Sequence, residues 1–434
     1  MYFSPETILT MTEDFLHYLW KFGLLEPSLT LTTGEACQII NPGTHNTHAG
    51  PDFLNARIRI DDTLWAGNVE IHISASDWYR HEHQKDDAYD NVILHVVYVE
   101  DKTVKRKSGE AIPSLEISGK FDNLLLRRYQ TLMDNKSWIP CASLIGSVDR
   151  ITRNSWLDRV LVERLEKRTK EINERLEFNK GDWSETFYQV LARNFGFRVN
   201  ALPMELLARS LPLNILAKHK DQPEQIEALV FGQSGLLSAK SRDSYFLKLK
   251  SEYDFLKKKY LLENMDAHLW RFLRLRPSNF PTIRLSQFAA LIHHSSHLFS
   301  KTLSIELVTE LAELFQCQAS EYWDDHYSFG KLKKGKPKKL GQAGINLILI
   351  NTVIPFLFAY GKQKGNPEFV DRSLKFLEQL SGESNALIRQ WHELGMNTRS
   401  AFQTQSLLEL KKEYCDRRRC LHCAIGARLV RSNW

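Results

Sequence analysis

Acidic and histidine side chains near the N-terminus occupy positions where two neighbouring strands could bring them together. Asp52 stands at the start of an alternating apolar run over 53–60, and Glu70 and His72 are two residues apart within the run over 64–74. Residues two apart on a strand share a face, so Asp52 on the adjacent antiparallel strand could point into the same cleft. Two carboxylates are ligands that Mg²⁺ or Mn²⁺ prefers, and such a site can polarise a phosphodiester and activate water. We expect Asp52 and Glu70 to bind the metal and His72 to position or deprotonate water.

The histidines of this region support a second interpretation. Of the 15 histidines in the chain, the cluster between residues 45 and 95 contains His45, His48, His72, His81, His83 and His95. His72, His81 and His83 with Glu70 could ligate zinc and hydrolyse some other substrate, with Asp52 outside the ligand set. A third alternative is purely structural: Asp52 caps a turn, and His72 and His95 are satisfied core histidines.

Cysteines form a separate cluster at the other end of the chain. Three lie within nine residues, Cys415, Cys420 and Cys423, and Cys141 follows Pro140 far upstream. Six cysteines in 434 residues are too few for a disulfide scaffold, so a cluster indicates a metal site. We expect Cys141, Cys415, Cys420 and Cys423 to hold zinc or an iron–sulfur cluster. His422 is an alternative fourth ligand, and reduced structural thiols are the alternative to a metal site.

The elements that must position these residues follow from apolar periodicity. A helix over 11–23 precedes three runs of β character over 29–40, 53–60 and 64–74, of which the second and third form a hairpin through Asp61-Asp62. A helix-compatible segment over 76–90 and a β-branched strand over 91–100 complete the order helix, three strands, helix, strand. A basic hairpin or loop over 101–119 follows, and after residue 121 the pattern is almost wholly helical, beginning with a long helix over 151–178.

This order and these motifs resemble the PD-(D/E)xK nuclease superfamily. Its core is α-β-β-β-α-β, with Pro-Asp opening the second strand and Glu-x-Lys on the third, and Pro51-Asp52 and Glu70-Ile71-His72 match those positions. The resemblance implies that Asp52 and Glu70 hold the catalytic metal. This sequence departs from the pattern at His72, where the superfamily has lysine, so the resemblance leaves turnover open while supporting metal binding.

The same resemblance implies auxiliary residues around the core. Glu13 on the first helix would be an additional acid, and Lys85 or Arg80 would supply the missing cation. Gln84 and Tyr89 are similar to a motif of the RecB-like branch. Over its whole length the chain also resembles an uncharacterised bacterial family of unknown function. That second resemblance implies no activity.

Basic residues could bind a nucleic-acid backbone if they share a face. The candidates occur in three segments and are Lys105, Arg106, Arg271, Arg274, Lys333 and Lys334. The chain has no Walker loop, dinucleotide fingerprint or nucleophile elbow, so an ATPase, a Rossmann oxidoreductase or a usual serine hydrolase is not expected. A helicase activity would require a protein partner.

Composition limits the class of protein. The chain has 58 Lys+Arg against 52 Asp+Glu, a net charge of +6 that permits a polyanionic partner without requiring one. The first residues lack the pattern of a secretory signal, so we expect a cytoplasmic protein. The uncharged run over 340–361 is long enough to cross a bilayer, but a buried helix explains it better, and we expect no membrane span.

Together these patterns predict an α+β protein of two domains. Residues 1–120 would form a restriction-endonuclease-like core, and residues 121–434 a large, mostly α-helical domain with the C-terminal cysteine cluster. The leading function is Mg²⁺- or Mn²⁺-dependent hydrolysis of DNA. The alternatives are a catalytically silent nucleic-acid-binding or assembly module with the same fold, and the zinc-dependent hydrolase.

Overall fold

The computed structural model describes residues 11–295, 297–333 and 335–432, which divide into two compact units. The first unit contains the described residues up to Trp156 and those from Leu410 onward, and the second contains Leu157–Glu409. Whereas the sequence suggested a boundary after residue 120, these units divide after Trp156 and again before Leu410. The chain is therefore a mixed α+β protein in which a sheet-containing unit receives both ends of the described chain.

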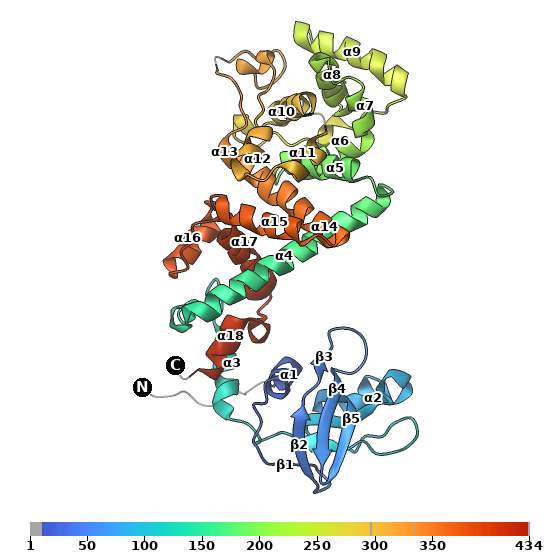
Figure 1. Ribbon diagram of the computed structural model, residues 1–434, viewed down its shortest axis with the longest axis vertical. Coiled ribbons are helices and arrows are strands. Elements are labelled where there is room, and N and C mark those ends of the chain that lie inside the picture. Colours follow the sequence, from blue (N-terminus) through green and yellow to red (C-terminus); the bar gives the residue numbers. More distant parts are fainter. Residues whose placement is uncertain (1–10, 296, 334, 433–434) are drawn as a thin grey trace. The chain divides into compact units, whose positions relative to one another are not determined.

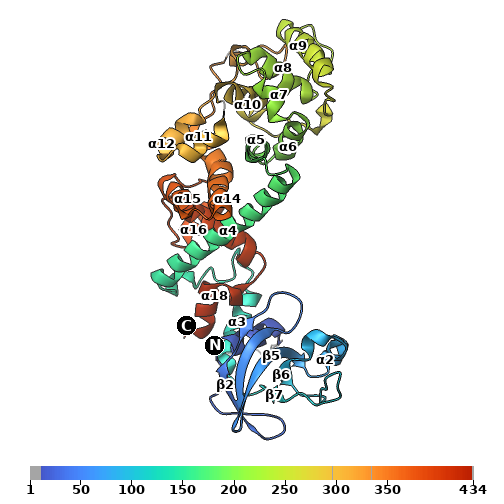
Figure 2. The same cartoon turned by 45° about the vertical axis from the view of Figure 1, so that its right-hand side comes forward.

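The first unit is built on one seven-stranded sheet, visible in blue in Figure 1 and with β2, β5, β6 and β7 labelled in Figure 2. The strand order is β1-β2-β4-β5-β6-β7, with β3 paired to β4. Neighbours from β1 to β5 are antiparallel, whereas β5–β6 and β6–β7 are parallel. The strands are β1 (Leu29–Thr30), β2 (Ala36–Asn41), β3 (Thr44–His45), β4 (Phe53–Ile60), β5 (Thr63–Ser74), β6 (Val92–Val99) and β7 (Ser114–Glu116). The runs of β character over 53–60, 64–74 and 91–100 thus predicted β4, β5 and β6 to within about one residue.

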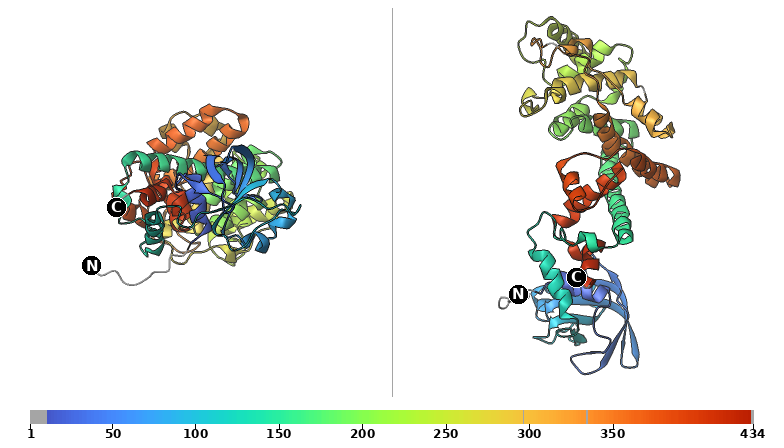
Figure 3. Two further views of the ribbon diagram at one scale, coloured as in Figure 1. Left: turned by 90° about the horizontal axis from the view of Figure 1, so that it is seen from below. Right: turned by 90° about the vertical axis from the view of Figure 1, so that its left-hand side faces the viewer.

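Helices and helical turns complete the first unit. They are α1 (Glu13–Lys21), α2 (Asp77–Arg80), η1 (His83–Lys85), η2 (Asp87–Tyr89), α3 (Asn123–Asp134), η3 (Ile145–Ser147), η8 (Lys411–Cys415), η9 (Cys420–His422) and α18 (Ala424–Arg431). The right-hand view of Figure 3 shows the C-terminal segment beside α3, in agreement with the contacts between α18 and α3.

The prediction of a helix over 76–90 is wrong in its extent. The segment contains one turn of α-helix, α2, followed by the two 3-10 turns η1 and η2. Glu82 adopts a left-handed backbone conformation with φ of 61°, and Asp86 is extended, so the helical hydrogen-bond pattern stops at both residues. This irregular backbone is what holds His81 and His83 close to the sheet.

A bulge in β4 shapes the sheet beside Asp52. The register of β4 against β5 shifts between Phe53 and Ala56, and Asn55 has a positive φ of 58°. The Asn55 N–H, which the ladder no longer uses, donates to the side-chain oxygen of Asn68 at 3.2 Å. Bulges bend a strand and redirect its side chains, and this one lies next to the acidic cluster.

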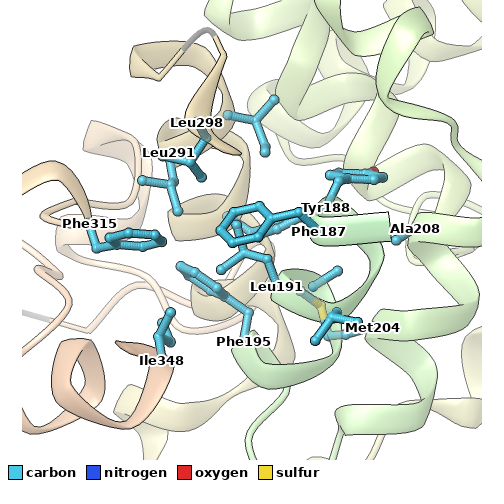
Figure 4. Close-up of a cluster of buried hydrophobic side chains, with 14 of the residues drawn as sticks. Phe187, Tyr188, Leu191, Phe195, Met204, Ala208, Leu291, Leu298, Phe315 and Ile348 are labelled. Carbon is cyan, nitrogen blue, oxygen red and sulfur yellow. The ribbon is translucent and has the colours of Figure 1, made fainter. Parts of the chain in front are cut away.

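The second unit is helical, and a single large apolar core runs through it (Figure 4). Its aromatic centre includes Phe187, Phe195 and Phe315, which are almost fully buried. Its longer helices are α4 (Arg150–Phe178, which begins in the first unit), α5 (Trp183–Phe195), α6 (Ala201–Ser210), α8 (Pro223–Gln233), α9 (Ser244–Tyr260), α10 (Pro281–His294), α14 (Ile354–Lys364), α15 (Pro367–Gln379), α16 (Ala386–Glu393) and α17 (Ala401–Leu410). The shorter helices and turns are α7 (Leu213–Ala217), η4 (Ala267–Leu269), η5 (Pro277–Asn279), α11 (Leu298–Ser304), α12 (Val308–Leu314), η6 (Glu321–Asp324), α13 (Gln342–Ile348) and η7 (Leu349–Val353).

The uncharged run of the sequence is a helix of the second unit. Among the described residues, the helix Gln342–Lys364 is the one that is long and apolar enough to cross a membrane, and 67% of its apolar window is buried within the structure. It comprises α13, the π-helical turn η7 and α14. Burial of this extent matches the expected core helix.

The π-helical turn has a local cause. Pro355 has no N–H to donate to the carbonyl of Asn351, four residues earlier in the helix. The side-chain amide of Asn194 on α5 donates to that carbonyl at 3.0 Å and to the Thr352 hydroxyl at 2.7 Å. Polar groups that would be costly in an apolar helix are therefore satisfied from a neighbouring helix.

Removing the Asn194 amide should leave the Asn351 carbonyl without this donor. We expect Asn194→Ala to lower the free energy of unfolding by about 1–3 kcal/mol. Pro355→Ala restores a backbone N–H at the position that needs it, so Asn194→Ala should cost less in that background. Urea unfolding of the four proteins of this double-mutant cycle measures the coupling, and strictly additive effects would contradict the explanation.

Candidate metal and catalytic site

The two predicted carboxylates meet at the junction of β4 and β5. The Asp52 N–H donates to Oε2 of Glu70 at 3.0 Å, and the Ile71 N–H donates to Oδ2 of Asp52 at 3.0 Å. Glu70 is only 5% exposed. Burial raises the pKa of Glu70 well above its usual range, and the negative charge of Asp52 raises it further. An ionised Glu70 at this position therefore requires a cation.

His72 shares the face of Glu70, as the two-residue spacing predicted. Its Nδ1 lies 2.8 Å from Nε2 of His95, which occupies the neighbouring strand β6. Its Nε2 lies 3.5 Å from Oε1 of Glu70. Burial lowers the pKa of His72 to about 2, and the neighbouring histidines contribute to the same shift. In the absence of a metal the His72 imidazole is neutral.

Two further histidines approach from the irregular segment after α2. Nδ1 of His81 lies 3.2 Å from Nε2 of His72, and Nε2 of His83 lies 3.3 Å from Oε1 of Glu70. One ligand atom from each of His72, His81 and His83 lies within 4.8 Å of the others. The geometry thus unites the carboxylates of the first interpretation with the histidines of the second.

The helix α1 contributes two residues to the same site. Burial raises the pKa of Glu13, and the charge of Asp52 raises it further. Nε2 of His17 lies 3.2 Å from Oδ2 of Asp52. Burial alone would lower the pKa of His17, but the carboxylate of Asp52 outweighs it and leaves the pKa above its ordinary value. His17 was not among the predicted residues, although its four-residue spacing from Glu13 places both on one helix face.

The remaining auxiliary candidates differ in their surroundings. The Tyr89 ring stacks on the His83 imidazole with centroids 3.9 Å apart. Oε1 of Gln84 is buried and has no hydrogen-bond partner among the described residues. Lys85 pairs with Glu82 at 2.5 Å in an exposed ion pair, so its ammonium is already neutralised there. Tyr89 is therefore the auxiliary candidate that contacts a histidine of the site.

The predicted nucleic-acid-binding residues divide between the two units. Arg106 is mostly covered, because its guanidinium donates to the Val92 carbonyl and pairs with Glu110. Lys105 is exposed in the first unit. The exposed cations of the second unit are Arg271, Arg274 and Lys333, and Lys334 lies outside the described residues.

The four clustered cysteines all belong to the first unit. Cys141 precedes α4, Cys415 ends η8, Cys420 begins η9 and Cys423 caps the N-terminus of α18. Cys37 is a buried residue of β2, where burial raises the pKa of its thiol to about 11.

Comparison with known proteins gives one match. No curated protein and no solved structure is similar to the chain at a significant level. A family model described as a protein of unknown function (DUF2851) matches residues 13–386, which run from the start of α1 to the start of α16. The match includes the acidic and histidine site and Cys141, whereas Cys415, Cys420 and Cys423 follow it. The chain therefore belongs to the DUF2851 family of proteins of unknown function.

Proposed function

We propose that the first unit is a metal-dependent hydrolase that cleaves phosphodiester bonds in DNA. The observation that carries this proposal is the meeting of Asp52, Glu70 and His72 at one buried place, with Glu70 facing both Asp52 and the histidines. A buried carboxylate surrounded by metal-ligating side chains is costly unless a cation neutralises it. Such an arrangement favours a function over a purely structural role.

The topology of the sheet supports a restriction-endonuclease-like classification. The helix α1 precedes the antiparallel strands β2, β4 and β5, and β6 returns parallel to β5 after α2. Apart from the short strands β1, β3 and β7, this order resembles the α-β-β-β-α-β core of the nuclease superfamily. In that comparison Asp52 at the mouth of β4 and Glu70 on β5 would correspond to the superfamily's metal ligands.

The ligand atoms fit a transition metal better than Mg²⁺. Oε1 of Glu70 faces the Nε2 atoms of His72 and His83, while Oε2 faces Asp52. Nε2 of His83 is buried and has no hydrogen-bond partner among the described residues, as expected of a nitrogen reserved for a metal. Imidazole nitrogens with a carboxylate suit Mn²⁺ or Zn²⁺, whereas Mg²⁺ prefers oxygen ligands alone. We infer Mn²⁺ as the working metal, because its preference for carboxylate oxygens matches Asp52 and Glu70 and, as a transition metal, it also accepts imidazole.

Each protein group then has a distinct role. A divalent metal bound here supplies a Lewis acid for the phosphate and lowers the pKa of bound water. The 2.8 Å contact between Nδ1 of His72 and Nε2 of His95 would fix the tautomer of His72 when a metal is bound, because with Nδ1 as the donor its Nε2 is left as a ligand. We therefore assign His72 to metal binding rather than to water activation. His17 holds the Asp52 carboxylate in place.

The partners and location of the protein remain part of the proposal. Exposed Lys105, Arg271, Arg274 and Lys333 would contact phosphates, and a helicase is the kind of protein partner that such a nuclease would serve. The mostly buried apolar helix supports a cytoplasmic location.

The histidine ligands can be tested without any substrate. We expect His83→Ala to weaken Mn²⁺ binding to the EDTA-treated full chain by more than about tenfold, because it removes one ligand nitrogen. His48→Ala, an exposed histidine of the same unit, is the matched control and should leave affinity unchanged. Isothermal titration with Mn²⁺ is the measurement, since thiolates bind this ion poorly. Equal affinities of the two variants would remove His83 from the ligand set.

The reaction is tested by metal-dependent cleavage. The EDTA-treated full chain is supplied with Mn²⁺, Zn²⁺ or Mg²⁺ and labelled single- or double-stranded DNA or RNA. We expect Asp52→Asn and Glu70→Gln each to lower the rate of DNA cleavage by more than about a hundredfold. The exposed Asp62→Asn is the matched control. Cleavage that survives Asp52→Asn would belong to another protein, and no cleavage with any metal would reject the nuclease proposal.

Replacement of His72 by the superfamily's lysine has a clear expected outcome here. The position is 2% exposed and faces three other histidines. An ammonium group could pair with Glu70, but it would lose the contacts of the imidazole with His81 and His95 and would lie desolvated beside their rings. We therefore expect His72→Lys to lower the free energy of unfolding by more than about 2 kcal/mol. Urea unfolding beside His48→Lys measures the difference. An unchanged stability with faster cleavage would show instead that the lysine is accepted as a catalytic cation.

A second candidate function follows from the three histidines. One ligand atom from each of His72, His81 and His83 lies within 4.8 Å of the others, which favours a zinc-dependent hydrolase of another substrate. Tight Zn²⁺ binding that requires His83, together with no cleavage of any nucleic acid, would support this candidate. Nucleic-acid binding without cleavage and without metal affinity would instead indicate the silent module.

A further inference from the structure

The C-terminal segment from Leu410 onward folds against the residues that lead to Cys141. Arg418 lies between Cys415 and Cys420 in the sequence. Its guanidinium donates to the carbonyl of Met133 and, at 3.0 Å, to that of Asn135. The Asn135 side-chain amide in turn donates to the carbonyl of Pro140 at 2.9 Å. This chain of hydrogen bonds joins the cysteine-rich tail to the residue immediately before Cys141.

The four cysteines gather in one part of the first unit. Cys141, Cys420 and Cys423 are buried, Cys415 is half-buried, and all four are free thiols. Burial raises the pKa of Cys415, and Cys141, Cys423 and Cys420 raise it further because they lie close enough to repel a thiolate. Cys141 is affected in the same way by Cys423 and Cys420.

Cys423 is the N-cap residue of α18. Burial raises the pKa of its thiol to about 11, whereas the adjacent N–H groups of Gly426 and Ile425 and the Trp156 side chain lower it. N–H groups beside a sulfur favour its charged form and are typical of cysteines that ligate metals. Gly426 allows the close approach of α18 to η9, because a Cβ there would lie 2.3 Å from the Cys420 carbonyl oxygen.

Positive charge lies beside the other thiols. Burial raises the pKa values of Cys415 and Cys420, and the positive charges of Lys411 beside Cys415 and of Arg418 beside Cys420 counter part of that rise. Cys37 differs from these residues, because burial is the cause that raises its pKa and no other cysteine contributes to the shift.

We propose that Cys141, Cys415, Cys420 and Cys423 together hold a thiolate-bound metal centre that fastens the C-terminal segment to the rest of the first unit. Four thiolates suit either a tetrahedral zinc ion or an iron–sulfur cluster. The centre is separate from the acidic and histidine site, and the proposal does not depend on the proposed hydrolase activity.

The fastened segment also supports α1. The hydroxyl of Tyr18 donates to the Ala427 carbonyl at 2.9 Å, and Nε2 of His422 lies 3.8 Å from Oδ1 of Asp14. The same helix α1 carries Glu13 and His17, which surround Asp52. The centre therefore stabilises the position of a helix that the acidic site uses.

Metal content of the full chain tests the proposal. The chain is purified without oxygen, and zinc, iron and acid-labile sulfide are measured together with the visible spectrum. We expect about one zinc per chain without colour, or about four irons with matching sulfide and a brown colour. Cys420→Ser should lower the bound metal by more than about tenfold, whereas Cys37→Ser and Cys317→Ser should not. The zinc content of His83→Ala, compared with that of the wild-type chain, shows how much of the zinc is bound at the histidines.

Limited proteolysis of the wild-type chain supplies a measurement that does not depend on the folding of a variant. A mercurial reagent removes thiolate-bound metal from the intact protein, and cleavage between residues 410 and 434 should then become at least about tenfold faster. Two results would overturn the proposal. One is a wild-type chain that retains neither zinc nor iron and takes up neither on incubation, and the other is a Cys420→Ser chain with an undiminished metal content.

Discussion

A carboxylate on a strand that is buried on both faces is the constraint on which the first unit depends. Glu70 lies in the half of β5 where Val69, Ile71 and His72 are also buried, so water cannot stabilise its charge. Neighbouring elements contact both oxygens of this carboxylate. The Asp52 N–H donates to Oε2, and His83, from the irregular segment after α2, lies beside Oε1. The irregular backbone at Glu82 and Asp86 is what brings the imidazole of His83 to Glu70.

The histidines change what chemistry the same backbone can perform. A lysine beside paired carboxylates contributes a fixed positive charge, whereas neutral imidazoles contribute lone pairs. His95 lies behind His72 and is itself buried and neutral, since burial lowers its pKa to about 3. The histidines around Glu70 therefore contribute lone pairs rather than positive charge, and burial makes Glu70 favour its protonated form.

Much of this site could be predicted from the sequence, and the reasons for the exceptions are physical. The alternating runs specified β4, β5 and β6, and the two-residue spacing placed Glu70 and His72 on one face. The segment over 76–90 was misjudged because a left-handed Glu82 leaves no trace in apolar periodicity. His17 was missed because its role depends on how α1 lies against β4, which no local pattern encodes. The helices of the second unit were expected, but their packing does not indicate a catalytic site in the way that the acidic and histidine residues of the first unit do.

The first unit is discontinuous, and this has a consequence for its biosynthesis. Its sheet and α1 emerge first from the ribosome, whereas the segment from Leu410 that covers α1 and α3 is translated last, after all of the second unit. Until then Tyr18 lacks its partner carbonyl and Cys141 lacks its companion thiols. The helices α1 and α3 therefore lack these contacts while the second unit is translated, and a chain that ends before Leu410 would not form them.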